Sequence, residues 1–187
     1  MNREVAPGLV QVYTGNGKGK TTCALGAGLR AAGHGLDVLV ISFMKAKVAS
    51  RGGGEEVNYG EFKSIESIPN YKIVPVGRET FVDKTNPDPI DVKMAQDGYA
   101  LAQRALSHHQ CDVLILDEIN VAVEWKLISL EQQLALIDLK PPDVELIMTG
   151  RYARQEVIDA ADLVTEMKEI KHYYETQKTT ARRGFEF

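Results

Sequence analysis

The sequence has 187 residues, of which 44% are apolar and 26% charged, a composition that suits one globular domain with a substantial core. Its net charge of −4 excludes a bulk electrostatic attraction to nucleic acid or to an anionic membrane. No apolar run could span a bilayer, and residues 1–5 lack the apolar centre of a signal peptide, so we expect a cytoplasmic protein. Cys23 and Cys111 are each expected to fill a small space in the core.

Strand-like and helix-like segments alternate along the chain. After a short arm at 1–8, apolar runs predict strands at 9–13, 36–43, 72–76, 112–116, 144–148 and 163–167. Helices are predicted at 23–32, 61–68, 89–109, between Ser129 and Pro141, and at 153–160. Segments 44–58 and 77–88 are expected to be loops, the first of them mobile because it contains three consecutive glycines. A surface insertion is the favoured interpretation of 44–58, and a lid or substrate loop is the alternative. Residues 168–187 are expected to form an irregular tail.

This alternation predicts one doubly wound α/β domain over 1–187, with a mostly parallel sheet. Capping residues mark two of the helix starts. Asp88 precedes a proline that suits the first helical position, and Ser129 with Gln132 forms the pattern of a capping box. Ligands of such sheets bind beyond the carboxyl ends of the strands, so we expect the site in the loops that follow the strands.

The stretch 14–22, Thr-Gly-Asn-Gly-Lys-Gly-Lys-Thr-Thr, joins a predicted strand to a predicted helix, as a phosphate-binding P-loop does. Its three glycines are expected to turn the backbone through positive φ and bring N–H groups close to an anion, where the helix N-terminus adds positive charge. Lys20 is expected to contact the distal phosphates and Thr21 to bind Mg²⁺. Thr14 stands where the usual pattern has glycine, and the alternative is a glycine-rich turn that binds nothing.

Two carboxylates, Asp117 and Glu118, end the fourth predicted strand and look like a Walker B element. Oxygen ligands suit Mg²⁺, so a metal site of Thr21, Asp117 and Glu118 is predicted. Glu118 either ligates the metal or orients an attacking water, and the weaker alternative is a solvated pair of acids. Arg151, after the fifth strand, is expected to contact a phosphate, or else to pair at the surface. The residues expected to bind the nucleotide are Thr14, Gly15, Asn16, Gly17, Lys18, Gly19, Lys20, Thr21, Thr22 and Arg151.

Other polar residues show no comparable pattern. The four histidines lack metal-ligand spacing, and the basic residues of the tail are expected to form a solvated face, with attraction of an anionic ligand as the alternative. The residues alone therefore predict an enzyme that binds Mg-nucleotide through a P-loop. They do not show which bond of the nucleotide is broken.

Seven blocks resemble the P-loop corrinoid adenosyltransferases, the ATP:cob(I)alamin adenosyltransferases of cobalamin synthesis and salvage. They are 14–22, Ala-Ala-Gly-His-Gly (31–35), Leu-Asp-Glu-Ile-Asn (116–120), Thr-Gly-Arg (149–151), Ala-Asp-Leu-Val-Thr-Glu-Met (161–167), Lys-His (171–172) and Ala-Arg-Arg-Gly-Phe-Glu-Phe (181–187). The resemblance extends from Leu9 to the C-terminus and includes Thr14 of the P-loop. It implies a P-loop NTPase fold of RecA-like type. It also implies transfer of the 5′-deoxyadenosyl group of Mg-ATP to the Co(I) of a corrinoid, with release of triphosphate.

The resemblance also implies roles for individual residues. Lys20, Thr21 and Glu118 would be catalytic, with Mg²⁺ held by Thr21 and Glu118 and with Asp117 close by. ATP and the reduced corrinoid are the substrates, an external reductant such as a flavoprotein supplies Co(I), and a homodimer is suggested. The family's aromatic residues below the corrinoid correspond to 77–88, where Phe81 matches the phenylalanine but no tryptophan follows. The alternative for Phe81 is a core residue that anchors the loop.

Two other functions are compatible with a P-loop. A kinase or ATPase would break the γ-phosphoryl bond, with Glu118 orienting water. A RecA-like module that binds nucleic acid would need a basic face, against which the acidic charge balance argues.

Overall fold

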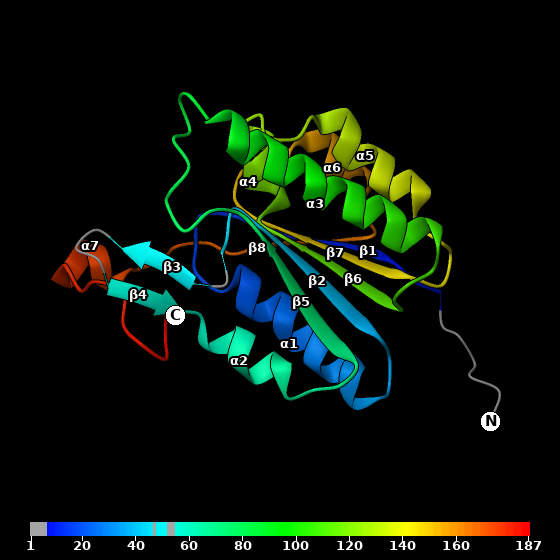
Figure 1. Ribbon diagram of the computed structural model, residues 1–187, viewed down its shortest axis with the longest axis horizontal. Helices are drawn as coiled ribbons and strands as arrows, with labels where there is room; N and C mark the ends of the chain where they lie inside the picture. The colour runs from blue at the N-terminus through cyan, green and yellow to red at the C-terminus, as the bar shows by residue number, and fades with distance from the viewer. Residues whose placement is uncertain (1–6, 47, 52–54) are drawn as a thin grey trace.

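A computed structural model describes residues 7–46, 48–51 and 55–187 and shows a six-stranded parallel sheet between two layers of helices (Figure 1). The strand order is β5-β2-β6-β7-β1-β8. The strands are β1 (Val10–Thr14), β2 (Val38–Phe43), β5 (Tyr71–Val76), β6 (Val113–Asp117), β7 (Glu145–Thr149) and β8 (Leu163–Glu166). Each begins within two residues of its predicted start, and the predicted α/β fold with a mostly parallel sheet is confirmed.

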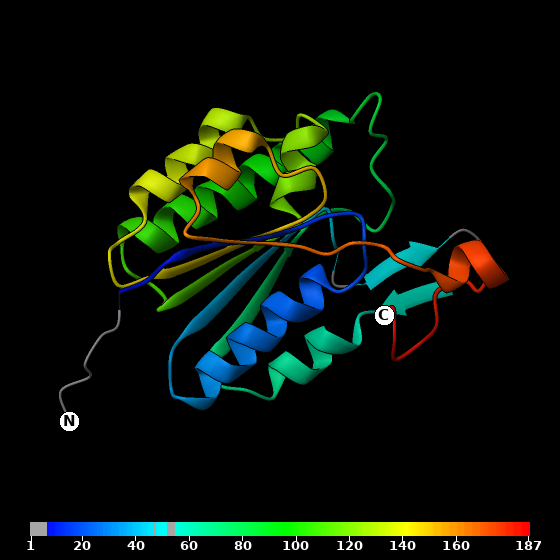
Figure 2. The ribbon, with the colours of Figure 1, turned by 180° about the vertical axis from the view of Figure 1, so that it is seen from behind.

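Helices cover both faces of the sheet (Figures 1 and 2). One face carries α1 (Lys20–Gly33) and α2 (Gly60–Glu66). The other carries α3 (Pro89–Ser107), α4 (Ile119–Glu124), α5 (Leu130–Leu139) and α6 (Gln155–Ala160). Both predicted caps are present: the Asp88 carboxylate accepts a hydrogen bond from the N–H of Ile90, and Ser129 with Gln132 forms the full capping box. These caps fix where α3 and α5 begin.

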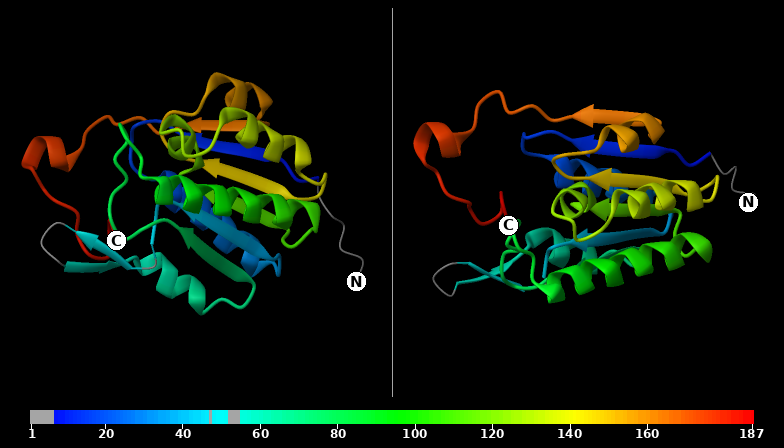
Figure 3. Two further views of the ribbon diagram at one scale, coloured as in Figure 1. Left: turned by 45° about the horizontal axis from the view of Figure 1, so that its top comes forward. Right: turned by 90° about the horizontal axis from the view of Figure 1, so that it is seen from above.

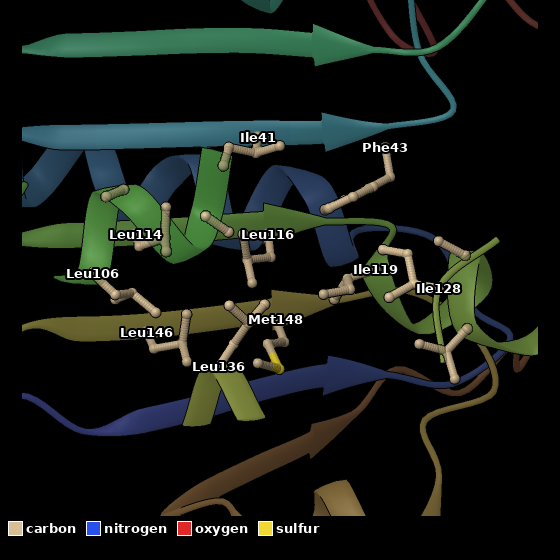
Figure 4. Packing of buried hydrophobic residues seen from close by; sticks show 14 of the residues in the cluster. Ile41, Phe43, Leu106, Leu114, Leu116, Ile119, Ile128, Leu136, Leu146 and Met148 are labelled. Carbon is tan, nitrogen blue, oxygen red and sulfur yellow. The ribbon is translucent and has the colours of Figure 1, made fainter. Parts of the chain in front are cut away.

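The core lies on both sides of the sheet because its parallel strands are covered on both faces. All five residues of β6 are buried. Leu114 and Leu116 pack with Leu146 and Met148 under the layer that contains α3 and α5 (Figure 4), whereas Ile115 faces the α1 layer. Fully burying a side chain such as Leu stabilises the fold by about 1.5–3 kcal/mol, so this strand is firmly held.

All six strands run in one direction, so their carboxyl ends lie at a single edge of the sheet (Figure 3). The P-loop follows β1 at this edge, and the strand that ends in Asp117 is separated from β1 only by β7. Loop 77–88 follows β5 at the same edge and contains no helix or strand, as expected. The topology therefore gathers the predicted site residues where ligands of such sheets bind.

The segment 44–58 is not the irregular loop that the sequence predicts. Its described parts form an antiparallel hairpin of β3 (Val48–Arg51) and β4 (Glu55–Asn58), with Val48 opposite Asn58. The segment has no alternating hydrophobic pattern that would have predicted strands, and the hairpin is instead defined by backbone pairing between its two strands. The three glycines at 52–54, on which the expected mobility rested, lie outside the described residues, as do residues 1–6 of the arm.

Two smaller expectations also change. The tail contains a short helix, α7 (Tyr173–Gln177). Cys111 is buried as expected, but Cys23 is exposed. The buried positions of α1 are four residues apart, at Lys20, Ala24, Gly28 and Ala32, and Cys23 lies outside that row. Among the described residues, no helix is long and apolar enough to cross a membrane.

Candidate functional site

The P-loop between β1 and α1 contains three glycines, which the structure requires for two different reasons. Gly15 and Gly19 have positive φ angles of 94° and 116°, as predicted for this loop. Gly17 does not, so the expected reason for that glycine is wrong. Its N–H donates to the carbonyl oxygen of Met167 at 2.7 Å, and a Cβ at Gly17 would lie 2.7 Å from the same oxygen. Gly17 is therefore required by the chain that crosses the loop after β8.

Lys20 begins α1 and lies against the P-loop. Its ammonium donates to the carbonyl oxygen of Gly17 at 2.6 Å, and the residue is only 8% exposed. Burial lowers the pKa of Lys20 and the nearby Arg151 adds to this, while the carboxylate of Glu118 opposes it. A bound polyphosphate would add negative charge beside this buried ammonium and favour its charged form.

Asp117 is a buried hub of four hydrogen bonds, each 2.8 Å long. One carboxylate oxygen accepts from the hydroxyls of Thr21 and Thr149, and the other accepts from Ser42 and from the ammonium of Lys45. Burial raises the pKa of Asp117, but Lys45 and the hydroxyl donors outweigh this and hold it below its usual range. The four donors leave Asp117 without a spare lone-pair direction for a metal. It instead orients Thr21, whose oxygen can then face a cation.

Glu118 has a left-handed backbone conformation (φ 62°), and its N–H donates to the hydroxyl of Thr149 at 3.0 Å. Burial and the neighbouring Asp117 raise the pKa of the Glu118 carboxyl. Glu118 and Thr21 both line a cavity at this edge of the sheet, and together they offer the hard oxygen ligands that Mg²⁺ prefers beside phosphate oxygens. Among the described residues, no group of three or more His, Cys, Asp or Glu is placed to hold a metal ion.

A cavity of about 1060 Å³ opens at this edge of the sheet. Its volume is slightly above the usual range for small-molecule sites, about 300–1,000 Å³. The predicted residues that line it are Asn16, Gly17, Lys18, Gly19, Lys20, Thr21, Thr22, Glu118 and Arg151. Thr14, Gly15 and Asp117 do not line it. Thr14 lies behind the loop, where its hydroxyl accepts from the N–H of Ala153 at 3.3 Å.

Arg151 is placed by a buried polar chain. Gly150 has a φ of 128°, and its carbonyl oxygen accepts a hydrogen bond from the side-chain amide of Asn120 at 3.1 Å. Asn120 in turn accepts one from Gln133 of α5 at 2.8 Å. A Cβ at Gly150 would lie 3.1 Å from Asn120, so glycine allows the turn that carries Arg151 to the cavity.

Phe81 is 86% exposed and does not line the cavity. The alternative that it anchors the loop in the core is therefore wrong. Arg78 anchors this loop instead, because its guanidinium donates two hydrogen bonds, of 2.7 and 2.5 Å, to the buried carboxylate of Asp91 in α3. The expected role of Phe81 toward a corrinoid stays a prediction.

Sequence reasoning missed two parts of the cavity. Lys45 lies two residues beyond the end of β2, at the same edge as the P-loop, and the rule that ligands bind at this edge could have found it. Tail residues, among them Tyr173, Phe185 and Glu186, also line the cavity. No local pattern could have placed them there, because their contacts join positions more than 150 residues apart.

The fold and the site define a P-loop protein that binds Mg-nucleotide at the carboxyl edge of a parallel sheet. Its sequence agrees throughout with one family of such proteins. The chain belongs to the family described as ATP:corrinoid adenosyltransferase BtuR/CobO/CobP, whose model matches residues 6–187.

Several similar proteins bear the corresponding name. A corrinoid adenosyltransferase of Pseudomonas aeruginosa is 33% identical over 96% of this chain and 84% of its own length. A corrinoid adenosyltransferase of a Sinorhizobium species is 32% identical over 96% of this chain and 80% of its own length. The corrinoid adenosyltransferase CobA of Salmonella typhimurium is 31% identical over 90% of this chain and 80% of its own length.

Proposed function

We infer that this chain transfers the 5′-deoxyadenosyl group of Mg-ATP to the Co(I) of a reduced corrinoid and releases triphosphate. The observation that carries this inference is the family match over residues 6–187, which includes the P-loop, Glu118 and the tail. The electron pair of Co(I) forms the bond to C5′ of the ribose. The C5′–O bond breaks, and its electrons leave with the triphosphate. Co(I) is itself the nucleophile, so the protein needs no activated serine or cysteine.

The chain's main task is then to hold ATP for in-line attack and to stabilise the charge of the leaving triphosphate. We assign this to the N–H groups of the P-loop, the ammonium of Lys20 and the guanidinium of Arg151, all of which line the cavity. Mg²⁺ bound by Thr21 and Glu118 would neutralise phosphate oxygens. Asp117 does not line the cavity, and its role is indirect, because it accepts a hydrogen bond that holds the Thr21 hydroxyl in place.

We propose that Phe81, an exposed aromatic ring on loop 77–88, contacts the corrinoid. Generating Co(I) requires an electron donor, and we propose an external reductant such as a flavoprotein. A homodimer and a cytoplasmic location are further proposals, which come from the family and from the composition.

The decisive experiment is anaerobic incubation of cob(I)alamin with Mg-ATP, followed by visible spectra and phosphate analysis. We expect adenosylcobalamin and inorganic triphosphate in equal amounts. Lys20→Ala and Glu118→Ala should each lower the rate by about 100-fold or more, as loss of a charge-stabilising group does. Orthophosphate without adenosylcobalamin would sink the proposal and favour the kinase or ATPase alternative.

The proposed role of Phe81 has its own test. Phe81→Ala should slow adenosylation of a corrinoid that enters as Co(II) in the presence of reductant, while ATP affinity stays unchanged. A variant that turns over this substrate as fast as wild type would remove Phe81 from the site.

A further inference from the structure

The C-terminal segment, residues 168–187, forms the wall of the cavity that faces the P-loop. Figure 2 shows it passing the P-loop after β8 and folding back beyond the carboxyl edge of the sheet. Its contribution to the lining is rich in rings: His172, Tyr173, Tyr174, Phe185 and Phe187. This wall therefore presents aromatic rings, whereas the P-loop opposite presents glycines and lysines.

This segment is docked on the P-loop at several points. The carbonyl of Met167, just before the segment, accepts from Gly17, and the side-chain oxygen of Asn16 accepts from the N–H of Glu169 at 3.2 Å. The ammonium of Lys18 donates to the carbonyl oxygen of Phe185 at 3.0 Å. Lys18 also lies 3.5 Å from the carboxylate of Glu186. The loop that is expected to hold phosphates thus also holds the segment.

Glu186 gives the segment a defined shape. Its carboxylate accepts hydrogen bonds from the Tyr173 hydroxyl and from the N–H of Arg182, the latter at 2.6 Å. The pKa of Glu186 falls to about 2 because of the hydrogen bonds from Tyr173 and Arg182. The Arg182 guanidinium lies 4.9 Å from the ring centre of Tyr173 and 4.7 Å from that of Phe185. Phe185 is held in this way and is still 70% exposed.

The two walls of the cavity suit the two halves of a nucleotide. Polyphosphate fits the P-loop wall, where N–H groups, Lys20 and Arg151 lie. It suits the opposite wall less, because the carboxylate of Glu186 there already neutralises Lys18 and Arg182. Aromatic side chains are the usual platform for a nucleobase, whose flat face stacks on them.

We propose that the C-terminal segment is the nucleoside-binding half of the ATP site, with Phe185 stacking on the base and Glu186 fixing the segment to Lys18. The inference rests on the proposed function insofar as the nucleotide is ATP. Phe185 is then a residue that contacts substrate, and Glu186 is a positioning residue. Lys18 links the phosphate half of the site to the nucleoside half.

The test compares the affinities of the whole chain for two ligands, Mg-ATP and Mg-tripolyphosphate, by isothermal titration calorimetry. Tripolyphosphate reports the phosphate half alone. Phe185→Ala should weaken ATP binding by about tenfold, the order expected for a lost base–aromatic stack, and leave tripolyphosphate binding unchanged. The matched control is Ile170→Ala, which removes an 89% exposed apolar side chain of the same segment that does not line the cavity. It should change neither affinity.

Glu186→Gln supplies a second, opposite signature. It should weaken ATP binding because the segment loses its tie to Lys18. Tripolyphosphate should bind as tightly as to wild type or more tightly, because a carboxylate has been removed from beside Lys18. A segment that only stabilises the fold would instead lower both affinities together.

Two results would overturn the proposal: Phe185→Ala binds ATP as tightly as wild type, or Phe185→Ala loses affinity for ATP and tripolyphosphate equally. If Phe185→Ala fails to fold, Phe185→Leu and Glu186→Gln provide the test, again through the ratio of the affinities for Mg-ATP and Mg-tripolyphosphate. Failure of the proposed function would look different. The variants would then show the expected changes in ATP and tripolyphosphate affinity, but the wild-type protein would form no adenosylcobalamin.

Discussion

Replacing Lys45 by methionine should destabilise the protein through the buried Asp117 that it leaves behind. The ammonium of Lys45 lies 2.8 Å from a carboxylate oxygen of Asp117, and the side chains are 16% and 1% exposed. Methionine keeps most of the side-chain volume of lysine and removes the charge. The substitution therefore isolates the electrostatic contribution of the pair from its packing.

The size of the effect follows from what Asp117 retains. Breaking a buried ion pair by removing one partner costs about 3–5 kcal/mol, because a charge is left buried without compensation. Asp117 would still accept hydrogen bonds from Thr21, Ser42 and Thr149, so we expect the lower end, about 3 kcal/mol. For a chain of this size that corresponds to a fall in melting temperature of roughly 6–12 °C.

The assay is urea denaturation of wild type, Lys45→Met, Asp117→Asn and the double variant. The double variant should be more stable than the sum of the two single losses predicts, by about 1–3 kcal/mol, because neither charge is then left alone. A Lys45→Met protein within about 0.5 kcal/mol of wild type would refute the reasoning. So would single losses that simply add.

The same pair sets a pH window. The folded pKa of Asp117 is lowered, so its stabilisation is present above its unfolded pKa of about 3.9 and is lost as pH falls through the lower folded value. Burial lowers the pKa of Lys45, but Asp117 outweighs this and raises it. The stabilisation that Lys45 contributes is therefore present below the unfolded lysine pKa of about 10.4 and is lost as pH rises through the higher folded value. The gap between wild type and Lys45→Met should thus be widest between these values.

Three further predictions concern stability and packing. Glu118→Gln should lower turnover by about 100-fold or more yet raise the melting temperature by about 2–4 °C, because the pKa of the half-buried carboxyl is raised; this gain should shrink as pH falls and protonates Glu118 in wild type. Gly150→Ala should cost about 1–3 kcal/mol in urea unfolding owing to its positive φ, whereas Gly26→Ala, in an open position of α1, should stabilise by up to about 1 kcal/mol. A thiol reagent should label only Cys23 in the native protein and both cysteines in urea, because burial raises the pKa of Cys111 to about 12; rapid native labelling of Cys111 would contradict the packing.

Local sequence determined much of the architecture, because the signals that specify it are short-range. The strand of Asp117 reads as a continuous apolar run, and β6 is buried along its whole length. The caps at Asp88 and Ser129 mark helix starts through side chains that bond backbone groups two or three residues away. The P-loop could be recognised because Lys20 and Thr21 follow the glycines in one contiguous stretch.

Only the tertiary structure decided how these parts act on one another. The four donors to Asp117 come from three segments, namely the start of α1, the end of β2 with the residues after it, and the end of β7, and their convergence on one carboxylate depends on strand order. Gly17 is small because the chain after β8 crosses it, a contact between residues 150 positions apart. The place of the tail could not be predicted from a local pattern, because long-range hydrogen bonds hold it: the ammonium of Lys18 donates to Phe185, and the N–H of Glu169 donates to the side chain of Asn16. The phosphate-binding loop is thus determined by local sequence, and tertiary contacts make that loop one wall of a cavity.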